Sequence, residues 1–298
     1  MDLINKKKKE SILLKNNRVA ILVDSCNDIP AHLTEKYGFY TMPLMINYKD
    51  ASYKDGVDIS PQEVYDSFKT EIPKTSLPLG SDIEALFDQI KADGYTHVIA
   101  SILSSGLSGT YQTMTLVIED RKDLTIEVID TRNIGIGSGF IAIYAAEQLE
   151  KGLDFQEVVT KARQAVTKST VFFGLETLEY LIKGGRIGKV EGILGSVLKI
   201  KPIISCNPEG IYDTVAKVRG RKQNIAKMLE LAKEKVGNSK DYYIALCHGA
   251  AEKEMLQMKD SISDLIAGAK VYCEGQISPV LGVHTGPGLL GIGVMVLD

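Results

Sequence analysis

The sequence lacks tryptophan and has only four cysteines among its 298 residues, with no CxxC pair. This scarcity argues against a disulfide-stabilised scaffold and a structural zinc site, and it fits a reducing cytoplasm. No apolar run approaches the roughly 18 residues that a membrane-spanning helix needs. The formal net charge is −3, so the chain lacks the basic excess of nucleic-acid-binding proteins. We therefore expect a cytoplasmic protein with no nucleic acid partner and no stable membrane anchor.

The first 17 residues precede any strand signal and contain four consecutive lysines at positions 6–9. A single short basic run gives at most transient contact with a membrane, so we expect a frayed N-terminal tail over residues 1–17.

Residues 18–168 alternate between strand-like and helical stretches, which predicts an α/β domain with a mostly parallel sheet. The run Val19–Val23 is continuously apolar and ends at Asp24, as in a strand buried on both faces. Further strands are expected at 96–103 and 125–130. Capping signatures at the N-terminus predict helices that begin at Ser60, Ser81 and Asp154, and a further helix after Pro30 that ends at Gly38.

Residues 169–298 predict a second α/β domain whose sheet mixes strand directions. The turn signal Asn207–Gly210 indicates a hairpin between two strands. Because no linker separates the halves, the two domains should pack closely. We expect strands at 170–174, 199–205, 211–218, 242–247, 270–273 and 290–297, and helices at 175–183, 221–236 and 250–266.

Glycine is abundant, with 27 residues, but its spacing does not predict nucleotide binding. The segment Gly286–Gly291 has the letters of a dinucleotide fingerprint, yet a strand-like stretch follows instead of a helix. The segment Gly184–Val190 lacks the glycine spacing and the Ser/Thr of a phosphate loop. The four histidines form no metal-binding motif, and we expect neither a metal nor a cofactor.

Serine catalysis has weak support, because no G-x-S-x-G elbow is present. His248 and His284 both follow apolar, strand-like runs, and either could pair with a serine in space. For His248 we favour a structural hydrogen bond at a strand end.

Segments rich in hydroxyl groups and glycine recur, most of them at predicted strand ends. Ligands of open α/β sheets bind beyond the carboxyl ends of strands, so these segments could converge on one site. Their hydroxyls, backbone amides and a helix N-terminus would bind a small anion such as a carboxylate. The segments are 24–25, 75–76, 104–110, 130–131 and 284–288.

The chain resembles the DegV family of fatty-acid-binding proteins from about Val19 to its C-terminus. The motifs that carry this resemblance are VDSCNDIP (23–30), YKDGVDISPQEVY (53–65), KTSLP (74–78), SSGLSGTYQ (104–112), LEYLIKGGRIG (178–188), KVRGRK (217–222), HGA (248–250) and VHTGPG (283–288). Three departures stand out: Cys26 replaces a small hydroxyl residue, Leu77 a common glutamine, and residues 130–139 keep only a general likeness.

The resemblance implies two packed α/β domains with one long-chain fatty acid between them. It assigns the carboxylate to Thr75 and to Ser105 or Ser104, with Ser105 preferred, and places Arg186 and His284 in the polar network. Possible supporting residues are Ser76, Ser25 and Gly286. It further implies a carrier without catalytic residues, which presents the acid to a separate fatty acid kinase for acyl-phosphate and phospholipid synthesis.

Two alternatives remain open from the residues. One is an enzyme in the same cleft, either a hydrolase using Ser105 and His284 or a phosphotransferase. The other is a binding module for a ligand that is not a lipid, for which the change at Leu77 leaves room.

Overall fold

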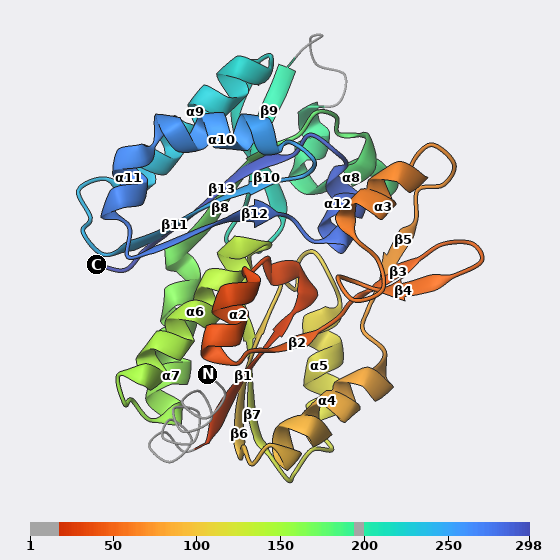
Figure 1. The fold of residues 1–298 in the computed structure, drawn as a ribbon, viewed down its shortest axis with the longest axis vertical. Coiled ribbons are helices and arrows are strands. Elements are labelled where there is room, and N and C mark those ends of the chain that lie inside the picture. Colours follow the sequence, from red (N-terminus) through yellow and green to blue (C-terminus); the bar gives the residue numbers. More distant parts are fainter. Residues whose placement is uncertain (1–17, 194–199) are drawn as a thin grey trace.

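The computed structural model describes residues 18–193 and 200–298 and arranges their strands in three sheets. The predicted tail of residues 1–17 lies outside the described residues, as does Lys199 at the start of a predicted strand. In Figure 1 a parallel sheet occupies the lower part of the molecule, a larger mixed sheet the upper part, and a small third sheet one side.

The first sheet has the order β2-β1-β6-β7, and its strands are all parallel, as predicted. Within β1, Ala20 and Leu22 belong to one apolar core, while Ile21 and Val23 belong to another. Successive side chains of a strand point to opposite faces, so β1 is buried on both sides. The strands are β1 (Val19–Asp24), β2 (Tyr40–Met42), β6 (His97–Ile102) and β7 (Thr125–Asp130).

Helices cover both faces of this sheet. Phe87 of α4 (Gly80–Ala92) and Met114 of α5 (Thr110–Ile118) lie in one core. Phe140 of α6 (Ile136–Glu150) and Val158 of α7 (Phe155–Ala165) lie in the other, with α2 (Ala31–Tyr37) beside them.

The predicted helix starts are partly confirmed. Ser60 forms a complete capping box at α3 (Pro61–Ser67), and Asp154 does so at α7. The helix after Pro30 ends at Gly38, whose φ of 67° only glycine adopts readily. The capping box at Ser81 is wrong, because α4 begins at Gly80 and Ser81 already lies inside the helix.

The second sheet has the order β10-β9-β8-β13-β11-β12 and is mixed, as predicted. The pair β11–β12 is parallel, and the other pairs, including the predicted hairpin of β9 and β10, are antiparallel. The strands are β8 (Ser169–Gly174), β9 (Ile200–Cys206), β10 (Tyr212–Arg219), β11 (Tyr242–His248), β12 (Val271–Gln276) and β13 (Leu290–Val296).

Helices α9 (Arg221–Val236), α10 (Glu252–Ser261) and α11 (Ser263–Gly268) cover the outer face of this sheet. The single helix predicted at 250–266 is wrong, because the chain leaves helical geometry at Ile262, where φ is −130°.

Helix α6 lies between the two large sheets. It contacts β1 and β6 of the first sheet and β8, β11 and β13 of the second. Most residues of α6 are buried, as expected of a helix whose side chains are apolar on every face. This helix was not predicted from the sequence, because it has no amphipathic stripe and its first turn contains glycines.

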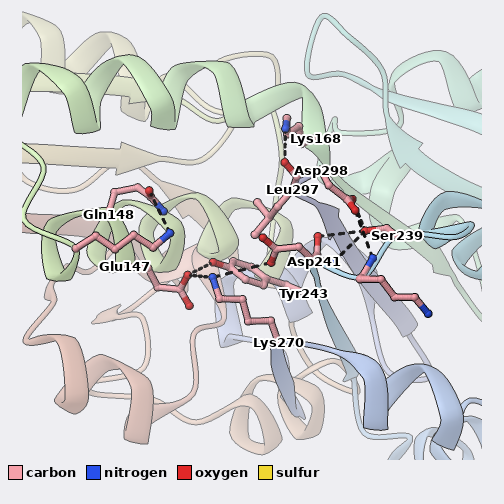
Figure 2. Close-up of polar contacts among 11 residues, drawn as sticks. Glu147, Gln148, Lys168, Ser239, Asp241, Tyr243, Lys270, Leu297 and Asp298 are labelled. Carbon is pink, nitrogen blue, oxygen red and sulfur yellow. Dashed lines mark hydrogen bonds and ion pairs between the residues drawn. The ribbon is translucent and has the colours of Figure 1, made fainter.

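Polar contacts also join the two halves (Figure 2). Glu147 of α6 accepts hydrogen bonds from the Tyr243 hydroxyl, at 2.6 Å, and from the Lys270 ammonium group. The Lys168 ammonium group donates to the carbonyl of Leu297 at 2.6 Å. The close packing predicted for the two halves is therefore present.

A third, antiparallel sheet has the order β4-β3-β5 and was not predicted. Its strands are only three residues long, too short for a periodic pattern: β3 (Met45–Asn47), β4 (Ser52–Lys54) and β5 (Lys74–Ser76). Beside it lie α3, α8 (Glu179–Lys183) and α12 (Pro279–Thr285). Within the described residues the remaining elements are three short 3-10 helices, at Ser25–Asn27, Val166–Lys168 and Gly188–Ile193.

Two predictions in this region are wrong. The helix expected at 175–183 begins only at Glu179. His284 does not follow a strand but lies in α12, which begins with Pro279 at its first position. None of the helices in residues 18–193 and 200–298 is long and apolar enough to cross a membrane.

Candidate functional site

A cavity that we call the polar cavity brings together four polar side chains from distant parts of the chain. Thr75 comes from β5, Ser108 from the loop before α5, Arg186 from the loop after α8, and His284 from α12. Its apolar wall consists of Cys26, Leu44, Leu103, Leu107, Ile134, Tyr212, Val280 and Leu281.

His284 and Thr75 form one unit in this cavity. The Thr75 hydroxyl and His284 Nε2 are 2.8 Å apart and hydrogen bonded. Nδ1 of His284 is buried without a partner, and a Cβ at Gly184 would lie 2.1 Å from it. Burial lowers the pKa of His284 to about 4, and the charge of Arg186 acts in the same direction. The imidazole is therefore neutral at pH 7.

Arg186 supplies a positive charge beside this pair. Its guanidinium donates to the backbone carbonyls of Leu107, at 3.2 Å, and Gly184, at 2.7 Å. Among the described residues no carboxylate forms an ion pair with Arg186. Glu179, which lies in α8 just before the loop of Arg186, forms its ion pair with Lys183. Carbonyls orient the guanidinium without neutralising it, so the cavity attracts an anion.

Ser104 and Ser105 are placed elsewhere. The Ser104 hydroxyl is buried and donates to the Gly210 carbonyl at 2.7 Å, while the Ser105 hydroxyl donates to the Asp130 carboxylate at 2.6 Å. Neither residue lines the polar cavity; the serine of this loop that does so is Ser108.

Ser108 was overlooked because the sequence pattern does not show how the loop turns. The backbone amide of Ser108 donates to the carbonyl of Ser104 at 3.2 Å, so the loop makes one turn before α5. The Ser108 hydroxyl lies 2.8 Å from that of Thr110, near the start of that helix. A serine two residues before a helix start is a signal that could have identified it.

The three supporting candidates have structural contacts. Ser76 is exposed and accepts from Asn47, and Ser25 accepts from the backbone amide of Leu44 at 3.1 Å. Gly286 ends α12 with a φ of 70°, where a Cβ would lie 2.2 Å from the ring of Tyr180. None of the three lines the polar cavity.

A second cavity, which we call the apolar cavity, adjoins the first and shares Ile134, Tyr212 and Leu281 with it. The apolar cavity has a volume of about 50 Å³ and the polar cavity about 30 Å³. The apolar cavity lies between the sheets, where β8, β13, α12 and the start of α6 meet. Its other wall residues are Asp28, Gly135, Ile136, Val171, Phe172, Phe173, Cys247, Ile277, Thr285, Leu289, Gly291, Ile292 and Gly293.

The geometry does not support serine hydrolysis. Ser105 bonds to Asp130 and His284 to Thr75, so the two do not form a nucleophile–base pair. His248 accepts from the backbone amide of Ala251 at 3.3 Å, as expected of a structural histidine. Within the part of the chain that the structure describes, no group of three or more potential metal ligands occurs.

Residues 18–296 match the family model described as "Uncharacterised protein, DegV family". The chain belongs to the DegV family. A DegV domain-containing protein of Clostridium acetobutylicum is 44% identical over 275 residues, which cover 92% of this chain and 98% of that protein.

Solved structures of fatty acid-binding proteins have the same fold. One from Thermus thermophilus, described as binding fatty acid, has a TM-score of 0.87 at 26% identity and covers 94% of this chain and 100% of its own. A stearic acid-binding protein of Eubacterium ventriosum has a TM-score of 0.84 at 27% identity, with coverage of 93% and 98%.

Proposed function

We propose that this DegV family protein binds one long-chain fatty acid and presents its carboxylate to a separate fatty acid kinase. The observation that carries the proposal is that the polar and apolar cavities adjoin and have three wall residues in common. An amphiphile with one anionic end and one apolar tail matches this arrangement. The related proteins of T. thermophilus and E. ventriosum, which bind fatty acids, support it.

The carboxylate binds in the polar cavity. Arg186 attracts its charge, and the hydroxyls of Thr75 and Ser108 donate hydrogen bonds to its oxygens. Neutral His284 orients the hydroxyl of Thr75. We assign this role to Ser108 in place of Ser104 and Ser105, since those two donate to Gly210 and Asp130 and do not line the polar cavity.

The tail binds in the apolar cavity and supplies most of the affinity. A sixteen-carbon chain buries about fourteen methylenes at roughly 0.8 kcal/mol each, on the order of 11 kcal/mol before the costs of binding. The side chains around the narrow cavity must move apart to admit it. With this contribution from the tail, the head group needs only hydrogen bonds and one positive charge.

The proposed reaction takes place on the partner kinase. A carboxylate oxygen attacks the γ-phosphorus of ATP, the bond to ADP breaks, and an acyl-phosphate forms. Hydroxyl donors weaken the nucleophilicity of a carboxylate less than a second cation would. The exposed residues Lys217 and Arg219 of the edge strand β10, with Lys222 of α9, suit docking on an acidic kinase surface or transient contact with anionic lipid. The chain itself needs no cofactor for this role.

Mass spectrometry tests the proposal. Protein purified from cells and denatured should release a long-chain fatty acid in a ratio of about one per chain. After removal of lipid, the protein should take up a radiolabelled fatty acid in the same ratio. A chain that carries no fatty acid and takes up none would refute the proposal.

A further inference from the structure

Asp28 is the only carboxylic acid in the wall of the apolar cavity among the described residues. Its backbone has φ 49° and ψ 30°, the left-handed conformation that most side chains avoid and aspartate tolerates. Strained conformations persist where the surrounding structure holds them, and they concentrate at functional sites. An acidic side chain in a cavity otherwise suited to hydrocarbon therefore requires an explanation.

Only one oxygen of the Asp28 carboxyl group accepts a hydrogen bond, and the Ser278 hydroxyl lies near the group without completing one. Oδ1 accepts a hydrogen bond from the backbone amide of Ser278 at 2.9 Å. Oδ2 is buried and has no hydrogen-bond partner. A Cβ at Gly135, another wall residue, would lie 3.1 Å from Oδ2, so the glycine leaves space at this oxygen. A buried polar atom without a partner costs free energy, and a bound group that bonds to it recovers that cost.

The protonation of Asp28 defines the group that it can bind. Burial raises its pKa to about 8, and the negative charges of Asp55 and Asp24 act in the same direction. The Ser278 amide and hydroxyl act in the opposite direction without reversing the shift. At pH 7 the carboxyl group is mostly protonated, so it offers one O–H donor as well as acceptor capacity.

We propose that Asp28 recognises an oxygen atom on the acyl chain, which makes the apolar cavity selective for hydroxy or oxo fatty acids. This inference rests on the proposed function, because it requires the tail to occupy the apolar cavity. The hydroxyl or carbonyl oxygen of the ligand accepts a hydrogen bond from the protonated Asp28 carboxyl group, and a ligand hydroxyl can also donate a hydrogen bond to that group. Sites built to hydrogen bond a substrate oxygen discriminate against analogues that lack it.

The test is competitive binding to the delipidated full chain, with stearic acid and a series of hydroxystearic acids whose hydroxyl moves along the chain. We expect one positional isomer to bind about tenfold more tightly than stearic acid, the gain of one buried hydrogen bond. Equal or weaker binding of every isomer would overturn the inference and leave the proposed function standing. Failure of stearic acid and all isomers to bind would instead overturn the proposed function.

Two substitutions at Asp28 separate recognition from folding. Asp28→Gly removes the carboxyl group and accepts the positive φ without strain, whereas Asp28→Asn keeps hydrogen-bonding capacity in the same backbone conformation. The ratio of the affinities for the hydroxylated isomer and for stearic acid should fall to about one in Asp28→Gly and stay near the wild-type ratio in Asp28→Asn. A preference that survives in Asp28→Gly would show that another group recognises the oxygen and would overturn the inference.

Discussion

The polar and apolar cavities share three wall residues but are built in different ways. Thr75, Ser108, Arg186 and His284 reach the polar cavity from a short strand, two loops and a short helix. The apolar cavity takes much of its wall from β8 and β13, adjacent strands of the larger sheet. We infer that a few hydrogen bonds in the polar cavity orient the head group of the ligand. The spacing between the sheets at the apolar cavity sets the affinity for its tail.

Filling the apolar cavity should have the largest effect. Gly291 lines it from β13, and a Cβ there would be in ordinary contact with Phe173 at 3.6 Å. Gly291→Leu should weaken fatty acid binding by about 100-fold, equivalent to losing three or four buried methylenes. Gly291→Ala is the matched control and should bind within a fewfold of the wild type by titration calorimetry. Unchanged binding to the leucine variant would show that the tail lies elsewhere.

Removing the charge from the polar cavity should have the next largest effect. Arg186→Gln should weaken binding by about 10- to 100-fold, as expected for a hydrogen bond to a charged group. The same substitution should raise the pKa of His284 above about 4, because Arg186 contributes to lowering it. Binding assays and NMR titration of the imidazole measure the two effects. If the pKa of His284 did not change in Arg186→Gln, the charge of Arg186 would not influence the imidazole.

Removing one neutral donor should have a smaller effect. Thr75→Val keeps the shape of the side chain but removes its bond to His284, and Ser108→Ala removes the other hydroxyl in the polar cavity. Each should weaken binding by about 5- to 10-fold. Ser105→Ala serves as the control, because the Ser105 hydroxyl donates a hydrogen bond to Asp130. Its removal should lower the stability of the protein and leave the affinity for fatty acid unchanged. A greater loss of affinity in Ser105→Ala than in Ser108→Ala would reverse our assignment.

The two cavities should also differ in how pH affects the stability of the protein. The pKa of Asp28 rises from 3.8 to about 8 on folding, so its contribution to stability is present below pH 4 and is lost as pH rises toward 8. Asp28→Asn should gain on the order of 1–3 kcal/mol over the wild type at pH 8 relative to pH 5.

His284 acts in the opposite direction, because its pKa falls from 6.5 to about 4 on folding. The stability that it contributes is lost as pH falls through that window, equally in the wild type and in Asp28→Asn. Urea unfolding followed by circular dichroism measures both proteins at each pH. A gap between them that does not change from pH 5 to pH 8 would contradict the shift assigned to Asp28.

Patterns confined to one element predicted the fold well. The apolar run of β1 and the capping residues Ser60 and Asp154 express local geometry, and the structure confirms all three. Helix α6 and the three-residue strands were missed because burial on every side, or very short length, removes periodicity. The family resemblance named Thr75, Arg186 and His284 as candidates, and the structure brings the three to one cavity.

The choice among the serines of the 104–110 loop could not be made from the sequence. Ser104, Ser105 and Ser108 are chemically alike, and their roles depend on Gly210 and Asp130, which come from other elements. Asp28 had the same difficulty, because its isolation in the apolar cavity arises only when β8, β13 and α12 surround it.

A crystal structure of the full chain with stearic acid brominated at its terminal carbon would show where the head group and the tail of the ligand lie. The anomalous signal of bromine marks the end of the tail independently of the head group. We expect the carboxylate within hydrogen-bonding distance of Thr75, Ser108 and Arg186, and the bromine beyond Leu281 among the β8 and β13 residues of the apolar cavity. A ligand bound in the reverse direction, or outside both cavities, would contradict this expectation.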